Sequence, residues 1–272
     1  MGKSMDILNF EGFINTKILS KDLVDGVGCF EFSNQPPDSA KNPQLPEKLM
    51  LGKRAERYFS LLIDLSDQYE MVLENIQVFE KSRTIGEFDF IVRRLNDNQL
   101  VHIELVYKFY LLDKQTASND MADWVGPNRN DSLKLKVEKL STGQFPLLKT
   151  EEAKNRLLDA HLNTSEIIQE LAFYANLFVP IHDPFSTHTL DDDAVEGYWG
   201  RFSDIAKLDS SGDKYFIPNK FDWFLRSAPD VNWMTLEEAS VDIKSQLNDS
   251  RSPMLWKLTK EGKFERLFVV WW

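Results

Sequence analysis

The sequence predicts an α/β protein in which one helix precedes three strands, further helices and a fourth strand, followed by an α+β extension. Three observations support this prediction. Apolar residues recur at helical spacing between Leu51 and Ile63. Two segments within 85–112 alternate between apolar and polar side chains, which is typical of half-buried strands. The short apolar run LFVPI at 177–181 then follows two segments of helical pattern.

Composition and charge narrow the class of protein. The chain has 272 residues, of which 42% are hydrophobic and 12% aromatic, as in a packed globular protein. No apolar run approaches the roughly 18 residues of a membrane span, and the first residues lack the apolar region of a signal peptide. We therefore expect a cytoplasmic protein with no membrane partner. Cys29 is the single cysteine, which excludes an internal disulfide and a cysteine-based zinc cluster.

The net charge of −11 weighs against a protein that coats long stretches of nucleic acid. It does not exclude an enzyme that holds a nucleic acid through metal ions and a local basic rim. The oligomeric state stays open.

Three segments are expected along the chain. Residues 1–46 form an arm that packs on the main body and a loop at 33–46 that is rich in Pro, Asn and Ser. Residues 47–182 form the core. Residues 183–272 form an α+β extension packed on the core, because no flexible linker precedes it.

The first helix of the core is predicted from residue 46 or 47 to about Tyr69. Glu56 borders its buried face, since at 100° per residue it lies about 60° from Phe59 and about 20° from Ile63. Its carboxylate can therefore point along the seam between the helix and the strands. The buried stripe consists of Leu51, Ala55, Phe59, Leu62 and Ile63.

A strand at 75–80 and a second strand at 85–93 follow. In the second strand, Asp89 lies on the face opposite the apolar side chains. The apolar face is expected to carry Phe88, Phe90 and Val92.

The third strand, at 100–112, also alternates. If it pairs with 85–93 through their apolar sides, Asp89, Glu104 and Lys108 emerge on one surface. His102 begins the polar face and is expected to be a strand-edge residue. The apolar face carries Ile103, Leu105, Tyr107, Phe109 and Leu111.

Three helices are predicted between the third and fourth strands. The first covers 132–140, with Asp131 as its N-cap and lysines on its solvated face. The others cover 151–161 and 164–175, and the fourth strand covers 177–181.

The extension begins with a polar, acidic loop at 183–197. A helix at about 235–247 begins with Thr235 and Glu238, which fit a capping box. The predicted strands are 197–202, 215–216, 254–258 and 264–272.

The charged side chains of the strand pair suggest a metal site. Carboxylates suit Mg²⁺, and two acids on adjacent strands repel each other unless a cation joins them. A nearby lysine can orient a water or offset charge on a phosphate. The alternative is a structural salt bridge of Asp89 and Glu104 with Lys108.

This arrangement resembles the PD-(D/E)XK nuclease superfamily, whose restriction-endonuclease-like core is a helix, three strands, a helix and a fourth strand. In that superfamily an acid from the helix, an Asp on the second strand, and a Glu and a Lys on the third bind metal and cleave phosphodiesters. The resemblance implies that Glu56, Asp89 and Glu104 are ligands of Mg²⁺ or Mn²⁺. It also implies that these three residues and Lys108 are catalytic. DNA is the implied substrate.

The whole chain also resembles a bacterial family known as domain of unknown function 1853. The motifs that carry this resemblance are LGKRAERYF at 51–59, GEFDFIVR at 86–93, HIELVYKFYL at 102–111, VGPNRNDSLKLKVEKL at 125–140 and RLFVV at 266–270.

One position departs from the nuclease pattern. The lysine usually stands two residues after the second acid, where this chain has Val106. Lys108 lies two residues further on the same face, roughly 7 Å away, within reach of a long side chain. Two alternatives stay open: a catalytically inactive module of the same fold that binds nucleic acid or a protein, and a protein-interaction scaffold built on the extension, which carries six of the seven Trp residues.

Overall fold

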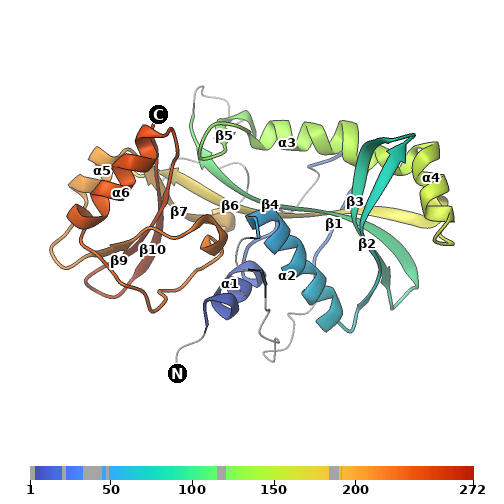
Figure 1. Ribbon diagram of the computed structural model, residues 1–272, viewed down its shortest axis with the longest axis horizontal. Coiled ribbons are helices and arrows are strands. Elements are labelled where there is room, and N and C mark those ends of the chain that lie inside the picture. Colours follow the sequence, from blue (N-terminus) through green and yellow to red (C-terminus); the bar gives the residue numbers. More distant parts are fainter. Residues whose placement is uncertain are drawn as a thin grey trace.

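A computed structural model describes residues 4–19, 23–32, 45–46, 49–114, 121–183, 190 and 192–272. Within these residues the chain forms an α/β structure around one large mixed sheet, with helices on both of its faces (Figure 1). None of the helices in this part of the chain is long and apolar enough to span a membrane. The predicted loop at 33–46 falls largely outside the described residues, as do 184–189 and 191 of the predicted loop at 183–197, whose last residues form a 3₁₀ helix (Asp192–Ala194) and the start of a strand.

The first half of the core follows the predicted order. Helix α2 (Leu51–Leu65) precedes strands β2 (Tyr69–Glu80), β3 (Arg83–Arg94) and β4 (Gln99–Leu112). Strand β3 pairs antiparallel with both of its neighbours. The helix and the strand pair are therefore confirmed, and β2 is longer than the predicted 75–80.

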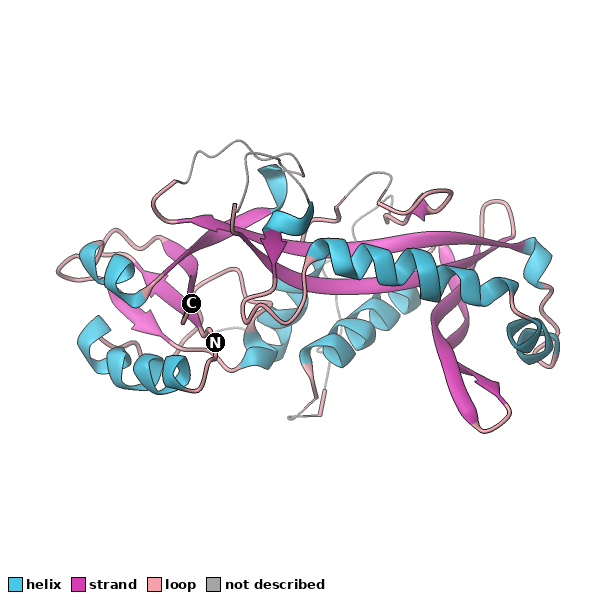
Figure 2. Ribbon diagram, turned by 90° about the horizontal axis from the view of Figure 1, so that it is seen from above, coloured by secondary structure: helices cyan, strands magenta, loops and turns pink. Residues whose placement is uncertain are grey.

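A long crossover joins β4 to the next central strand. It contains α3 (Leu133–Lys139), a π-helical turn (Leu140–Gln144), a 3₁₀ helix (Phe145–Lys149) and α4 (Glu151–Leu158). These helices run across the face of the sheet (Figure 2). The predicted helices at 132–140 and 151–161 are confirmed, whereas the π and 3₁₀ turns between them were not expected.

The predicted helix at 164–175 is wrong. After a 3₁₀ turn at Thr164–Glu166, the chain forms strand β6 (Ile167–Pro180), which pairs in parallel with β4 along nearly its whole length. Most of the second half of β6 is buried on both faces. A strand buried on both faces reads as a continuous apolar run, which periodicity cannot separate from a helix.

The N-cap of α3 also differs from the prediction. Ser132, not Asp131, caps the helix, because its hydroxyl accepts a hydrogen bond from the Leu135 backbone N–H at 3.3 Å. Asp131 instead forms an ion pair with Lys108 at 2.6 Å.

The two faces of the sheet bury separate clusters. Helices α1 (Met5–Ile14) and α2 cover one face and α3 covers the other (Figure 1). Phe10 and Phe13 of α1 pack on the Tyr58 ring of α2, so the N-terminal arm contributes directly to the core. Val106 and Tyr110 of β4 lie in the opposite cluster, beneath α3.

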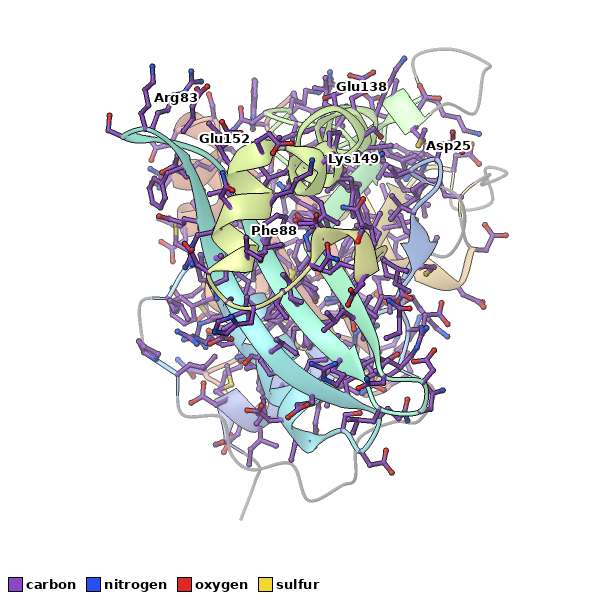
Figure 3. All side chains as sticks on the ribbon, turned by 90° about the vertical axis from the view of Figure 1, so that its right-hand side faces the viewer. Asp25, Arg83, Phe88, Glu138, Lys149 and Glu152 are labelled. Carbon is purple, nitrogen blue, oxygen red and sulfur yellow. The ribbon has the colours of Figure 1, made fainter. Side chains whose placement is uncertain are left out.

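The alternation of β3 breaks at Phe88. The ring of Phe90 lies 4.8 Å from that of Phe59 on α2, as expected. Phe88 instead lies 4.8 Å from the ring of His102 and clusters with residues of the opposite face, beside α4 (Figure 3). Because the β2–β3 hairpin projects from the sheet as a two-stranded ribbon, its strong twist turns Phe88 away from the face of Phe90 (Figure 2).

The C-terminal strands extend the same sheet. Strand β7 (Val195–Gly200) pairs in parallel with β6 and with β10 (Phe264–Val269). Strands β9 (Met254–Leu258) and β8 (Lys214–Phe216) follow, which gives the order β2-β3-β4-β6-β7-β10-β9-β8. Short strands β1 (Gly28–Cys29) and β5 (Trp124–Val125) pair with β6 and β4.

Two helices accompany these strands. Helix α6 (Leu236–Asn248) begins with the predicted capping box, in which Thr235 and Glu238 each accept a hydrogen bond from the other's backbone N–H. The six-residue helix α5 (Phe202–Lys207) was not predicted. It is too short for the sequence to show a clear helical period.

A partly buried group that we name the arginine cluster joins the C-terminal strands to the core. It consists of Arg226, Arg266, Glu196 and Asn176. Arg266 donates to Glu196 at 2.9 Å and to Asn176 at 3.0 Å. Arg226 pairs with Glu196 and donates to the Gly12 carbonyl of α1 at 3.1 Å. The cluster therefore ties β6, β7, β10 and α1 together.

Candidate metal site between strands β3 and β4

Two carboxylates meet where β3 separates from β4. The last paired residues of these strands are Phe90 and Ile103, so the edge of β4 beyond Ile103 loses its neighbour. Asp89 replaces it, because its Oδ2 accepts a hydrogen bond from the Leu105 backbone N–H at 3.0 Å. Glu104 stands next along β4, and its charge acts on Asp89. We name Asp89 and Glu104 the acidic pair.

Glu104 is fully buried, with 1% of its surface exposed. Its Oε1 accepts a hydrogen bond from His102 Nε2 at 3.0 Å. Its Oε2 accepts one from Gln144 Nε2 at 2.5 Å. Gln144 lies in the π-helical turn after α3, so the crossover helices hold one side of this carboxylate and the strand holds the other.

His102 fixes the orientation of Glu104 and is not a strand-edge residue. It is completely buried in the middle of the sheet, and burial lowers its pKa to about 4. The Gln169 amide donates to His102 Nδ1 at 3.2 Å and to the Phe145 carbonyl at 2.9 Å. The neutral ring therefore keeps its proton on Nε2, where it faces Glu104.

The acidic pair retains protons near neutral pH. Burial, and then the charge of Glu104, raise the pKa of Asp89 to about 7. Burial raises the pKa of Glu104 to about 8, while Lys136 opposes this rise. Buried like charges destabilise each other, and a bound cation would relieve this repulsion. Such perturbed groups are enriched at functional sites.

The positive charge of Lys136 acts on both members of the acidic pair. This lysine lies half-buried on α3, and burial lowers its pKa while the charges of Glu104 and Asp89 oppose this change. Its Nζ donates to Gln144 Oε1 at 3.2 Å, which links it through Gln144 to Glu104. The sequence assigned Lys136 to a solvated helix face. Its position about 40° from the buried Leu140 was the signal that it borders the core.

Lys108 lies apart from the acidic pair. It forms its ion pair with Asp131, and its side chain is 40% exposed. Lys108 does share a face of β4 with Glu104, as the alternation predicts, but its carboxylate partner comes from the loop before α3.

Glu56 lies near the acidic pair without joining it. Its carboxylate pairs with Lys53 at 2.6 Å, and Lys53 also reaches Glu87 at 3.5 Å. Burial raises the pKa of Glu56, and its charge contributes to the raised pKa of Asp89. Among the described residues, however, no three His, Cys, Asp or Glu side chains are close enough to hold a metal ion together.

The donor set fits a divalent cation held by two carboxylates. Each carboxylate oxygen has a second lone pair beyond the hydrogen bonds described above. Mg²⁺ keeps several waters and is commonly bound through one or two carboxylates. Asp89 and Glu104 would be the two carboxylates of such a site, and Glu56 would act through the water shell.

A family model described as Domain of unknown function (DUF1853) matches residues 31–270, so the chain belongs to this family. No curated protein and no solved structure matches the chain.

Proposed function

We propose that this DUF1853 protein is a metal-dependent nuclease that hydrolyses phosphodiester bonds, with DNA as its substrate. The observation that carries the proposal is the acidic pair: the buried Glu104 and the half-buried Asp89, both of raised pKa, at the point where β3 and β4 separate. A structural salt bridge would instead place a cationic side chain directly on these carboxylates. Lys136, whose charge acts on both carboxylates, is linked to Glu104 through Gln144.

The order of elements supports the proposal. A helix, three antiparallel strands, a helical crossover and a parallel fourth strand give the sheet order β2-β3-β4-β6. The sequence led us to expect this order from the resemblance to PD-(D/E)XK nucleases. Asp89 and Glu104 occupy the second and third strands of the order, as the resemblance implies.

Each residue has a distinct role in the proposed reaction. Asp89 and Glu104 would hold Mg²⁺ or Mn²⁺, which when bound lowers the pKa of water and neutralises charge on phosphate. Gln144 and His102 orient the Glu104 carboxylate. Lys136, whose pKa burial lowers, is suited to accept a proton from the attacking water. Lys108 is the alternative base if it leaves Asp131.

The test compares cleavage of single-stranded and double-stranded DNA by the wild type and three groups of variants, with Mg²⁺ or Mn²⁺ present. Asp89→Asn and Glu104→Gln should each lower activity at least about 100-fold, because each removes a metal ligand. Lys136→Met should lower activity by a similar factor but retain metal binding. Lys108→Met should leave activity unchanged. The exposed Lys139→Met is the matched control. Unchanged activity and metal binding in both acid variants would sink the proposal.

A second candidate is a module of this fold that binds nucleic acid without cleaving it. Val106 favours this candidate, since it occupies the usual position of the catalytic lysine and is buried beneath α3. Isothermal titration of Mn²⁺ discriminates between the two. Micromolar to low-millimolar binding that Glu104→Gln abolishes supports the nuclease, and the absence of binding supports the module.

A further inference from the structure

A pocket of about 500 Å³ opens along β4, on the C-terminal side of the acidic pair. Its wall includes the stretch of β4 between Ile103, the last residue that pairs with β3, and Leu111, the first that pairs with β5. In the described part of the chain, no strand pairs with this stretch on the side of β3. The pocket therefore adjoins the same gap in the sheet as the acidic pair. We name it the β4 pocket.

The surroundings of the β4 pocket favour an anion. It is lined by the first residues of α2, where Met50 offers no side-chain cap to the backbone N–H groups. A Cβ added at Gly52 would meet open space, so a ligand can approach this helix end. Lys220 lines the pocket, is exposed and pairs with no carboxylate among the residues described. These features are positive in a chain whose net charge is −11.

The pocket also offers apolar and aromatic surface. Tyr107, Phe109 and Phe221 line it, and Met50 beside them is 76% exposed. An anion alone would gain nothing from this surface, whereas the ring of a nucleobase would. The volume lies within the usual range for sites that enclose a small organic ligand. A phosphate joined to a flat ring satisfies both parts of the pocket.

One wall of the pocket is held in place by Trp272. Its indole Nε1 donates to the Pro127 carbonyl at 3.0 Å, and Pro127 lines the pocket. The Arg129 guanidinium lies over the Trp272 ring, 3.9 Å from its centroid. Asp131, also in the wall, is fixed by its ion pair with Lys108. The wall is therefore formed before a ligand arrives.

We propose that the β4 pocket binds the terminal nucleotide of the substrate strand, with its phosphate near Lys220 and the start of α2 and its base on the aromatic side chains. The choice of a nucleotide rests on the proposed function. Lys108, at the pocket, and Glu104 lie on the same strand, roughly 13 Å apart at the usual rise per residue. A strand whose end sits in the pocket can then pass over the acidic pair.

The test is isothermal titration of the full chain with a 2′-deoxynucleoside 5′-monophosphate, the unphosphorylated deoxynucleoside and inorganic phosphate. The monophosphate should bind at least tenfold more tightly than either fragment. Lys220→Glu and Gly52→Asp should each weaken it at least tenfold. Asp is well tolerated in the first turn of a helix, so Gly52→Asp should fold. Lys244→Glu, a charge change on α6, should leave binding unchanged.

The result separates this inference from the proposed nuclease. Glu104→Gln should abolish cleavage without changing nucleotide binding, because Glu104 does not line the pocket. The inference is overturned if the monophosphate does not bind, if phosphate alone binds as tightly, or if neither pocket variant weakens binding. Cleavage that persists in the wild type under any of these outcomes leaves the nuclease proposal intact.

Discussion

The acidic pair and the arginine cluster each bring two side chains of like charge together in the partly buried interior, yet the structure treats them differently. In the arginine cluster two guanidinium groups surround Glu196, and both donate to surrounding oxygen atoms. Burial and the charge of Arg226 lower the pKa of Arg266 only to about 10, so it stays charged at neutral pH. The acidic pair has pKa values of about 7 and 8, so it gains and loses protons near neutrality.

The difference shows that buried charges can serve either a structural or a functional role. An ion pair that is completed by hydrogen bonds fixes elements relative to one another, and breaking it leaves an unpaired buried charge. A pair of acids without a direct cationic partner is a source of instability that a bound cation can remove. The first group belongs to the junction with the C-terminal strands and the second to the proposed site.

Replacing a member of the arginine cluster should have the largest effect. Arg266→Met removes the donors to Glu196 and Asn176 and should lower the free energy of unfolding by about 3–5 kcal/mol. Urea denaturation measures this change, with the exposed Lys263→Met just before β10 as the control. A loss below about 1 kcal/mol would contradict the structural role of the cluster.

Replacing a member of the acidic pair should instead stabilise the protein, by an amount that depends on pH. The folded-state pKa of Glu104 is raised, so the folded protein keeps a proton that the unfolded chain has lost, and its contribution to stability falls as pH rises from about 4 to 8. Glu104→Gln removes this penalty. The difference in free energy of unfolding between this variant and the wild type should grow by about 1–3 kcal/mol in favour of the variant as pH rises from 5 to 9. A pH-independent difference would contradict the raised pKa.

The smallest expected effect concerns Lys136. Its positive charge opposes the rise in the pKa of Glu104 and of Asp89, so Lys136→Met should raise the pKa values of both further. Lys139→Met should raise them less, because Lys139 is exposed to solvent. Carbon-detected NMR titration of the two carboxyl groups measures both shifts. Equal shifts in the two variants would show that Lys136 has no special access to the pair.

The two groups also differ in how far the sequence predicts them. The acidic pair was predicted from the alternation of two adjacent strands, a local pattern that places Asp89 and Glu104 on one face of the strand pair. The arginine cluster has no such pattern, since Asn176, Glu196, Arg226 and Arg266 come from four distant parts of the chain. Gln144, which links Lys136 of α3 to Glu104, reaches the site through a π-helical turn that the sequence did not predict.

The sequence by itself determined the elements whose periods are clear: α2, the β3–β4 pair, α3 and the capping box of α6. Hydrophobic periodicity depends on neighbouring residues, so it can be read without the fold. Tertiary structure decided the rest. Pairing with β4 made a strand of the residues expected as a helix at 164–175, and the twist of the β2–β3 hairpin turned Phe88 away from Phe90. Tertiary structure also decided that β3 parts from β4 after Phe90 and Ile103, which leaves the gap where Asp89 and Glu104 lie. Contacts between distant segments, and not a local pattern, determine where two strands part.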